Sequence, residues 1–336
     1  VEVSGELIEC DLVIMAVGVR PNTVFAAEAG LAVGHGGSLI VDKNLRTSDP
    51  DIYAGGDCIE MRNLLSGAHL PTPLGSLANR QGRIIATNIF GKSAQFDGSV
   101  GTFCIKVFGI GVATAGLTIH QAKAAGFDPV HSVVAQFDRA HFYPNSKFMF
   151  IQLIADRSSR RVLGVEAVGE QIDAVKARVD AVVPLLHKGM NVDEVCTLEV
   201  GYAPPLASAM DVINNAGNAL DNILDGRNSP IDWPEFIDLF KKGEITVVDL
   251  RELVEAQPFI DKYGADRWIF LPQTELRERY NELPKDKDLC LFCGTGARSF
   301  ECQRILNQNG FTRIQNLQGG YAIIRATDPD FIPEGG

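Results

Sequence analysis

The sequence has no run of basic residues, no long apolar stretch and no cysteine spacing typical of a metal site. Its 336 residues include 31 Lys and Arg against 42 Asp and Glu, so the formal net charge is −11. This balance argues against a nucleic-acid-binding surface. No apolar stretch reaches the roughly 18 residues that a membrane-spanning helix needs. We therefore expect neither nucleic acid nor a membrane as a partner.

The number and spacing of the cysteines argue against a metal-binding function. There are seven, an odd number, and they are scattered along the chain. Cys290 and Cys293 form a C-x2-C pair without a second pair, so the sequence predicts no metal site and fits a reducing cytoplasm. Repeats and low-complexity tracts are absent as well. Because 46% of the residues are hydrophobic, we expect a globular chain of two or three domains.

The first residues read as a β-hairpin. Val1 begins the sequence abruptly, with no initiator Met and no signal peptide. We therefore interpret the sequence as the C-terminal part of a longer protein.

One stretch near the C-terminus predicts a reactive cysteine. Residues 289–292 are an apolar run typical of a buried strand, and Cys293 follows it directly. Two glycines then allow a tight turn before an amphipathic run over residues 300–306. At such a turn, unpaired backbone N–H groups and the helix dipole favour an anion. We expect the loop to stabilise the Cys293 thiolate, or the terminal sulfur of a persulfide on it.

The position of Arg298 indicates the substrate class. Cys293 and Arg298 are spaced as C-x4-R, one residue shorter than the C-x5-R loop with which protein phosphatases wrap a phosphate. The smaller loop suits a sulfur species as substrate. It disfavours a phosphatase or an arsenate reductase. The alternative is that Cys293 is an ordinary buried cysteine.

The segments around this loop carry a family resemblance. They are Val247-Val248-Asp249-Leu250-Arg251-Glu252, Glu275-Leu276-Arg277-Glu278-Arg279 and Asn316-Leu317-Gln318-Gly319-Gly320-Tyr321. Together with the loop, they resemble a rhodanese domain, with Cys293 and Arg298 as catalytic residues. One departure is visible: Trp268-Ile269-Phe270-Leu271-Pro272 stands where many rhodaneses carry a His-Ile-Pro segment.

Two upstream segments resemble flavin-dependent pyridine nucleotide-disulfide reductases. Residues 11–22 read as an apolar strand, similar to the strand that closes the nicotinamide domain of that family. Residues 47–58 read as a short buried strand ending in Gly55-Gly56-Asp57. The resemblance implies that this segment meets FAD, with Gly56 allowing close approach and Asp57 accepting hydrogen bonds. A plain Gly-Gly-Asp turn is the alternative.

A helix is predicted over residues 74–90, entered through two prolines and stopped at Gly91. The resemblance implies that its N-terminus, at Leu74, faces the flavin and stabilises negative charge on it. Asn79 and Arg80 fall where related enzymes contact substrate, and we place Asn79 with Gly56, Asp57 and Leu74 among the residues expected to bind the cofactor. A packing helix with a solvated polar face fits the same residues.

The next region resembles the dimerisation domain of the same family. We predict strands over residues 103–108, 130–137, 147–155 and 161–168, and helices over 172–188 and 210–224. Tyr143 and Tyr202 match the pattern positions of the active-site tyrosines of coenzyme A-disulfide reductases, which reach toward the partner subunit's redox cysteine. Interface or core packing is the alternative. Met210 stands where some relatives have a basic residue that contacts coenzyme A.

The predicted architecture is α/β with three parts: part of a flavin-binding doubly wound domain, an α+β dimerisation domain and a rhodanese-like domain with a parallel sheet. In the last part we expect helices over residues 233–241 and 253–263 and strands over 245–249 and 313–317. The predicted boundaries are 1–22 for the end of a nicotinamide-binding domain, 23–100 for the C-terminal part of an FAD-binding domain, 101–224 for dimerisation, 225–230 for a linker and 231–336 for the rhodanese-like domain.

The resemblance implies a cytoplasmic, homodimeric, FAD-dependent reductase driven by NAD(P)H. We expect its redox cysteine and glycine-rich dinucleotide loops to lie outside this sequence, and Cys293 to relay sulfane sulfur. A sulfurtransferase has no use in reducing a simple disulfide, so persulfide or polysulfide, such as coenzyme A persulfide, is the favoured substrate. The alternatives are a coenzyme A-disulfide reductase with an accessory rhodanese, and a sulfur-carrying or redox-sensing module without turnover.

Overall fold

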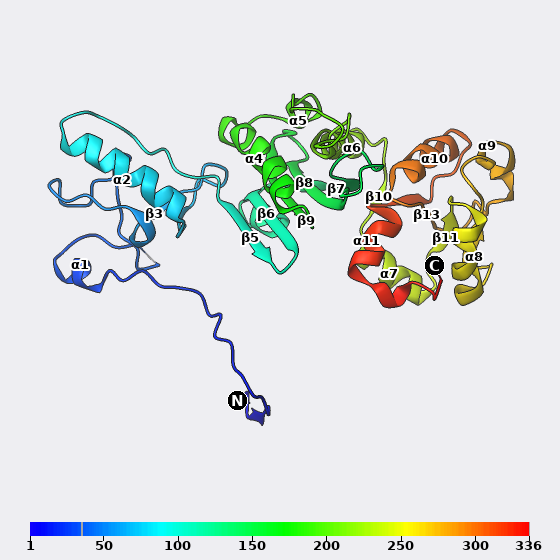
Figure 1. Cartoon of the computed structure of the whole chain (residues 1–336), viewed down its shortest axis with the longest axis horizontal. Helices are drawn as coiled ribbons and strands as arrows, with labels where there is room; N and C mark the ends of the chain where they lie inside the picture. Colours follow the sequence, from blue (N-terminus) through cyan, green and yellow to red (C-terminus); the bar gives the residue numbers. More distant parts are fainter. Residues whose placement is uncertain (35, 336) are drawn as a thin grey trace. The chain divides into compact units, whose positions relative to one another are not determined.

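The computed structural model describes residues 1–34 and 36–335 and divides into two compact units, Val1–Ser99 and Val100–Gly336 (Figure 1). Within the described residues, no helix combines the length and the apolar character that crossing a membrane requires. All seven cysteines are free thiols.

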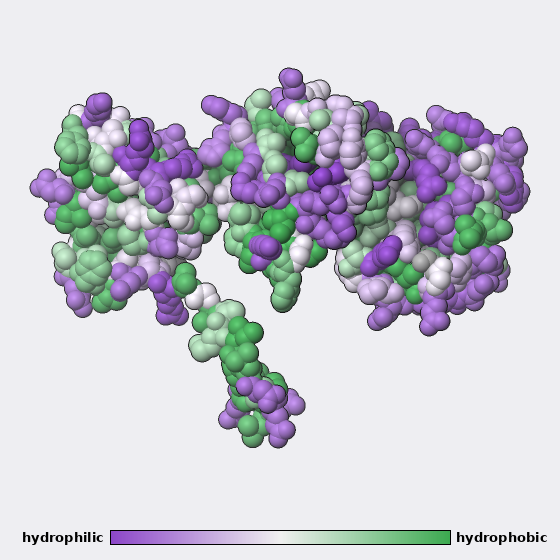
Figure 2. All heavy atoms as spheres, viewed as in Figure 1, coloured by the Kyte–Doolittle hydropathy of each residue, from purple (hydrophilic) through white to green (hydrophobic). Residues whose placement is uncertain are grey.

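The first unit begins with the predicted hairpin, in which β1 (Glu2–Val3) pairs antiparallel with β2 (Glu6–Leu7). The strand predicted over residues 11–22 is wrong. That segment pairs with no strand of the described chain, and its apolar side chains are exposed, as at Ile14 (82%) and Val17 (83%). Figure 2 shows hydrophobic residues along this extended segment. The segment is apolar, as the sequence indicates, but a strand also needs a neighbour for its backbone hydrogen bonds.

The remainder of the first unit surrounds a small core that includes Leu39, Ile59 and Leu77. Its elements are α1 (Val24–Glu28), the 3-10 helix η1 (Gly56–Cys58), β3 (Glu60–Arg62), β4 (His69–Pro71) and α2 (Gly75–Ile89). The helix predicted over residues 74–90 is confirmed as α2. The strand predicted over residues 47–58 is wrong: only Tyr53 forms a bridge, with Arg46. Turn-forming bonds, such as that from the Thr47 hydroxyl to the Ile52 carbonyl, bend this segment.

The second unit starts with an antiparallel five-stranded sheet in the order β5-β6-β9-β8-β7. Its strands are β5 (Thr102–Val107), β6 (Ile110–Gly116), β7 (Pro129–Phe137), β8 (Phe148–Asp156) and β9 (Val162–Gly169). Helices α4 (Ile172–Lys188) and α6 (Val212–Leu224) pack on it, and α3 (Ile119–Ala124) and α5 (Val192–Cys196) are short. The four predicted strands and both long helices are confirmed.

Strand β6 was missed because it is rich in glycine and alanine, which are poor strand formers. The structure explains this composition. A Cβ on Gly111 would lie 2.9 Å from the Ile172 Cα, and one on Gly116 would lie 2.3 Å from the Leu163 carbonyl oxygen. Larger residues would therefore push α4 and β9 away from this strand.

The second sheet is parallel throughout, in the order β10-β14-β13-β11-β12. Its strands are β10 (Pro230–Ile231), β11 (Thr246–Asp249), β12 (Trp268–Phe270), β13 (Leu289–Phe292) and β14 (Ile314–Leu317). The helices are α7 (Trp233–Lys242), α8 (Leu253–Tyr263), α9 (Leu276–Arg279), α10 (Ala297–Gln308) and α11 (Gly320–Thr327), with the 3-10 turns η2 (Tyr280–Glu282) and η3 (Pro329–Phe331). Pro230, predicted to end a linker, already pairs in β10.

Two apolar clusters lie on the two faces of this sheet. Alternate residues of β13 enter different clusters: Leu289 and Leu291 pack in one, Cys290 and Phe292 in the other. This alternation follows the side-chain period of a strand. All four residues of β13 are buried, as expected for the central strand of a covered parallel sheet.

Hydrogen bonds join the two sheets of the second unit. The Val133 N–H of β7 donates to Gln318 Oε1 at 2.8 Å, and Gln318 Nε2 donates to Asp232 Oδ1 at 2.9 Å. His131 Nε2 lies 2.9 Å from Asp232 Oδ2. Because Gln318 directly follows β14, these contacts fix the carboxyl end of the parallel sheet against the antiparallel one.

Candidate active site

Cys293 lies at the carboxyl end of β13, the edge where parallel α/β sheets place their sites. Its side chain has no exposed surface. The Gly296 N–H donates to the Cys293 sulfur at 3.2 Å, and the Ser299 hydroxyl oxygen lies 3.3 Å from the same atom. The sulfur is therefore held between the turn and the first turn of α10, as the sequence predicted for a strand-loop-helix arrangement.

The tight turn depends on glycines from two segments. Gly296 caps α10 with φ +95°, a left-handed conformation that favours glycine. The Tyr321 N–H donates to the Cys293 carbonyl at 2.8 Å, so the start of α11 holds the loop. A Cβ on Gly320 would lie 2.4 Å from that carbonyl oxygen. The Gly319-Gly320 pair is thus shaped to let α11 approach the cysteine loop.

Arg298 is half-buried and reaches back over the loop. A Cβ on Gly294 would lie 3.5 Å from the Arg298 Nη2 atom, so the guanidinium passes close to this part of the turn. Among the described residues, no carboxylate forms an ion pair with Arg298. Its charge is therefore available to an anion at the loop.

Sequence reasoning missed a buried ion pair below the loop. Arg251 is 2% exposed and binds Asp249 through its Nε and Nη2 atoms at 2.9 and 2.7 Å. The guanidinium carbon lies 4.9 Å from the ring centre of Phe292, the residue before Cys293. Trp268 donates its indole N–H to Asp249 at 3.0 Å. The Asp-Leu-Arg motif was a signal, but its pairing with Trp268 depends on β12 lying beside β11.

Ser299 and Asn316 were also not predicted as site residues. Ser299 is fully buried, and its hydroxyl donates to Asn316 Oδ1 at 2.6 Å. Asn316 lies on β14, is 4% exposed, and donates its Nδ2 to the Gly296 carbonyl at 3.2 Å. A single sequence offers no signal for this contact, because the two residues meet only when β14 pairs with β13.

The other cysteines of this domain are unsuited to nucleophilic chemistry. Burial raises the pKa of Cys302 to about 12, and the nearby Cys293 adds to this effect. Burial also raises the pKa of Cys290 well above its ordinary value. Both therefore stay protonated near neutral pH. Among the described residues, no group of three or more His, Cys, Asp or Glu side chains is placed to hold a metal ion.

The predicted tyrosines lie on neighbouring loops of the second unit. The Ala140 N–H donates to the Pro204 carbonyl at 3.3 Å, which joins the loop of Tyr143 to the loop of Tyr202. Tyr202 is 56% exposed, and Tyr143 is half-buried. Neither hydroxyl bonds another group of the described chain, and no hydrogen bond joins either tyrosine to the Cys293 loop.

Met210, which stands where some relatives have a basic residue, is exposed. Its carbonyl accepts a hydrogen bond from Gln136 Nε2 at 2.9 Å. The contact uses the backbone of residue 210, so it does not depend on the side chain that differs from the expected basic residue.

The predicted flavin-contacting residues lie in the first unit. Gly56 has φ +81° and donates its N–H to Gln81 Oε1 at 2.6 Å, which fixes η1 against α2. Asp57 is exposed. Leu74 is the N-cap of α2 and offers no side-chain cap, so the first N–H groups of this helix lack a side-chain partner. Asn79 donates to the Gly75 carbonyl of its own helix at 2.8 Å.

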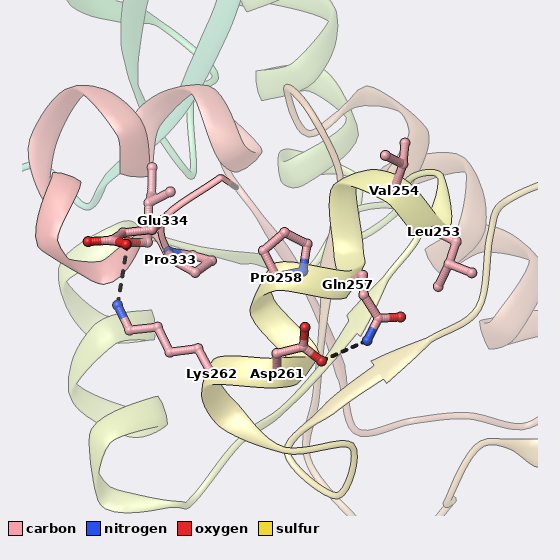
Figure 3. A pocket seen from close by; sticks show the side chains of 9 residues that line it. Leu253, Val254, Gln257, Pro258, Asp261, Lys262, Pro333 and Glu334 are labelled. Carbon is pink, nitrogen blue, oxygen red and sulfur yellow. Dashed lines mark hydrogen bonds between the residues drawn. The ribbon is translucent and has the colours of Figure 1, made fainter.

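A hollow of about 930 Å³ beside α8 lies outside these groups (Figure 3). Three of its polar side chains, Gln257, Asp261 and Lys262, already have partners. Gln257 donates to Asp261 at 2.8 Å, and Lys262 donates to the Asp330 carbonyl at 2.9 Å. Because none of the predicted site residues lines it, we assign it no role in the chemistry.

Comparison with known proteins defines the class. Residues 1–75 match the family described as pyridine nucleotide-disulphide oxidoreductase, residues 102–212 match its dimerisation domain, and residues 232–326 match the rhodanese-like domain. The chain belongs to the pyridine nucleotide-disulphide oxidoreductase family and carries a rhodanese-like domain.

Two solved structures match most of this chain. A solved NAD-dependent persulfide reductase from A. fulgidus is 37% identical, with a TM-score of 0.83, and the match covers 91% of this chain and 54% of that one. The reduced CoADR-RHD of Bacillus anthracis is 34% identical, with a TM-score of 0.86 and coverage of 98% and 58%.

Curated relatives match a shorter part of the chain. The NAD(P)H sulfur oxidoreductase (CoA-dependent) of Pyrococcus furiosus is 30% identical over 203 residues, which are 60% of this chain and 45% of that protein. The coenzyme A disulfide reductase of Staphylococcus epidermidis is 30% identical over 215 residues, 64% of this chain and 48% of that protein. The chain thus spans about half the length of the curated relatives it matches.

Proposed function

We propose that this chain forms part of an FAD-dependent, NAD(P)H-driven reductase of persulfides or polysulfides, such as coenzyme A persulfide, in which Cys293 carries sulfane sulfur. The observation that carries the proposal is the Cys293 loop itself. Its sulfur accepts a hydrogen bond from the Gly296 N–H at 3.2 Å and faces the Ser299 hydroxyl, while Arg298 supplies a positive charge that no carboxylate among the described residues pairs with. The Gly296 N–H and the Arg298 guanidinium suit an anionic sulfur species in a small C-x4-R loop.

The sulfur-transfer step needs no oxidant or reductant. The Cys293 thiolate attacks the outer sulfur of a persulfide or polysulfide, a new S–S bond forms, and the donor's S–S bond breaks. The donor leaves as a thiolate, and Cys293 keeps the transferred sulfur as a persulfide. Arg298 and the Gly296 N–H stabilise the negative charge on the sulfur during this exchange.

The first unit fits a contribution to FAD binding. Gly56 allows close approach of a ligand to the backbone, Asp57 presents an exposed carboxylate, and the uncapped N-terminus of α2 at Leu74 offers N–H groups to negative charge. When bound, FAD would accept a hydride from NAD(P)H and pass electrons to a cysteine. Asn79 and the exposed Asp57 are the side chains of this unit that we assign to the cofactor side.

The reductase part of the proposal includes a homodimer. Strand β5 lies at the edge of its sheet and exposes apolar side chains, including Phe103 (51%) and Val107 (46%). Such a surface favours a partner subunit. Tyr143 and Tyr202 are proposed to hydrogen-bond a thiolate or leaving sulfur, and changing either to Phe should slow persulfide reduction by the complete enzyme about tenfold. Unchanged rates in both variants would leave them as packing residues.

Coenzyme A-disulfide reduction is the second candidate, and the likeness to the Staphylococcus epidermidis protein favours it. That match, however, covers only 64% of this chain, whereas the match to the persulfide reductase from A. fulgidus covers 91%. The presence of the rhodanese-like domain therefore favours persulfide or polysulfide as the substrate. Free thiols throughout the chain support a cytoplasmic location.

The experiment compares Cys293→Ser with Cys104→Ser, which changes an exposed cysteine outside the loop. After treatment with polysulfide, mass spectrometry should find one added sulfur on the Cys293 peptide, and this sulfur should pass to an acceptor such as cyanide. Cys293→Ser should lower the transfer rate by about a thousandfold, and Cys104→Ser should leave it unchanged. Undiminished transfer by Cys293→Ser would disprove the proposal.

A further inference from the structure

The Ser299 hydroxyl contacts three groups but has only one hydrogen to donate. Its oxygen lies 2.6 Å from Asn316 Oδ1, 3.0 Å from the Gly296 carbonyl oxygen and 3.3 Å from the Cys293 sulfur. Ser299 and Cys293 are fully buried and Asn316 is nearly so. Where the hydrogen points therefore matters for the charge on the sulfur.

The orientation of the Asn316 amide follows from its neighbours. The Gly296 carbonyl oxygen can only accept, so the Asn316 atom that lies 3.2 Å from it must be the Nδ2 donor. The same Nδ2 lies 3.3 Å from Asn228 Oδ1. The opposite amide atom, Oδ1, therefore faces Ser299 and can only accept. Reversing the amide would place two acceptors against each other.

Counting hydrogens then fixes the role of Ser299 in the resting loop. Asn316 Oδ1 and the Gly296 carbonyl both accept only, and they compete with the sulfur for the Ser299 hydrogen. The shortest of the three contacts, at 2.6 Å, is the one to Asn316. Ser299 thus presents a lone pair to Cys293, and this contact is satisfied when the cysteine is a thiol that donates its S–H. A thiolate would face a lone pair until the hydroxyl turned.

We propose that Asn316 is a positioning residue that acts through Ser299. In the resting loop it turns the Ser299 hydroxyl away from Cys293, which favours the thiol. When the sulfur becomes anionic, Asn316 releases the hydroxyl to the sulfur. The inference deepens the proposed function, since it makes the charge on Cys293 depend on rotation of one buried hydroxyl. A hydrogen bond to the neutral form of a group disfavours its charged form, and a bond to the charged form favours it.

The test is a pH titration of the Cys293 thiolate by its far-ultraviolet absorbance, taken as the difference from Cys293→Ser in each background. Asn316→Leu should lower the midpoint by about one pH unit, which is roughly tenfold more thiolate at pH values below the midpoint. Asn316→Asp, which keeps the shape of the side chain, should raise the midpoint by a similar amount. Gln303→Leu is the matched control, because it removes a buried amide of α10 that does not touch Ser299.

Ser299→Ala separates positioning from a purely structural role. With the hydroxyl removed, Asn316→Leu should no longer move the midpoint. An unchanged midpoint in Asn316→Leu and Asn316→Asp would overturn the proposal, as would an equal effect of Asn316→Leu with and without Ser299. The titration uses no sulfur donor or acceptor. A shifted midpoint without sulfur transfer would therefore reject the proposed function and keep this inference.

Discussion

Cys293 and Asp57 are two of the residues that we propose act in a site, and their surroundings differ. Cys293 has no exposed surface, and the groups that contact its sulfur come from the same loop, between residues 293 and 299. Asp57 is exposed in the first unit, where an apolar segment that includes Ile14 is exposed as well. A site assembled from one loop is defined by its own chain segment. A site on an open surface depends on what is placed against that surface.

The largest effect should come from the ion pair below the cysteine loop. Arg251→Met leaves the Asp249 carboxylate buried without its cation, which costs about 3–5 kcal/mol in the free energy of unfolding. Both tryptophans of the chain, Trp233 and Trp268, belong to this domain, so denaturation followed by tryptophan fluorescence reports on it alone.

The matched control for this variant is Arg313→Met. Arg313 pairs with Asp288 on the surface, where the two side chains are 52% and 46% exposed. Its loss should cost far less than the loss of the buried pair, because solvent screens an exposed ion pair. Equal losses in the two variants would mean that the buried pair does not support the loop.

Gly320→Ala should have the next largest effect. The new methyl group would lie 2.4 Å from the Cys293 carbonyl oxygen, and Gly320 has φ +54°. Backbone strain and overlap together should destabilise the domain by about 3 kcal/mol and abolish sulfur transfer. Gly310→Ala has a similarly positive φ of +83°, but the nearest atom is the flexible Lys285 amine at 3.8 Å.

Gly310→Ala should therefore cost only about 1 kcal/mol and leave sulfur transfer intact. Stability and transfer would be measured on both variants by the same denaturation and transfer assays. Normal transfer by Gly320→Ala would show that the close approach of α11 does not hold the loop.

The sequence was informative where a feature is local. The apolar run before Cys293, the glycines after it and the spacing to Arg298 predicted a strand, a turn and a helix, and the structure contains all three. The sequence was less informative where a feature depends on pairing between distant segments. Residues 11–22 have the composition of a strand but no partner in the described chain, and the contact of Ser299 with Asn316 arises only from the pairing of β13 with β14.

The domain boundaries stay predictions. The tyrosines and the flavin-contacting residues stay predictions as well, for a different reason. Their roles concern groups outside the chain, such as a cofactor or a second subunit. The geometry of Asp57 or Tyr202 within one chain therefore cannot by itself define what each contacts.

The smallest effect concerns the contact that joins the carboxyl end of the parallel sheet to the antiparallel sheet. Burial would raise the pKa of Asp232, but the hydrogen bond and charge of His131, together with the Gln318 amide, hold it below the ordinary value of 3.8. A carboxylate whose pKa is lowered by folding stabilises the fold above its unfolded pKa, and this contribution is lost as the pH falls through the lowered value. Asp232→Asn should therefore cost stability at neutral pH but flatten the loss of stability below about pH 4.

The Asp232 side chain is 38% exposed, so solvent screening limits the contribution to about 1 kcal/mol or less. The measurement is tryptophan fluorescence during denaturation across the acidic range, for the unchanged chain, Asp232→Asn, His131→Ala and the double variant. The two changes should be coupled at neutral pH, and the coupling should vanish once the carboxyl is protonated. Additive effects at every pH would mean that His131 and Asp232 stabilise the fold independently, and that the acid sensitivity of this domain arises from other carboxylates.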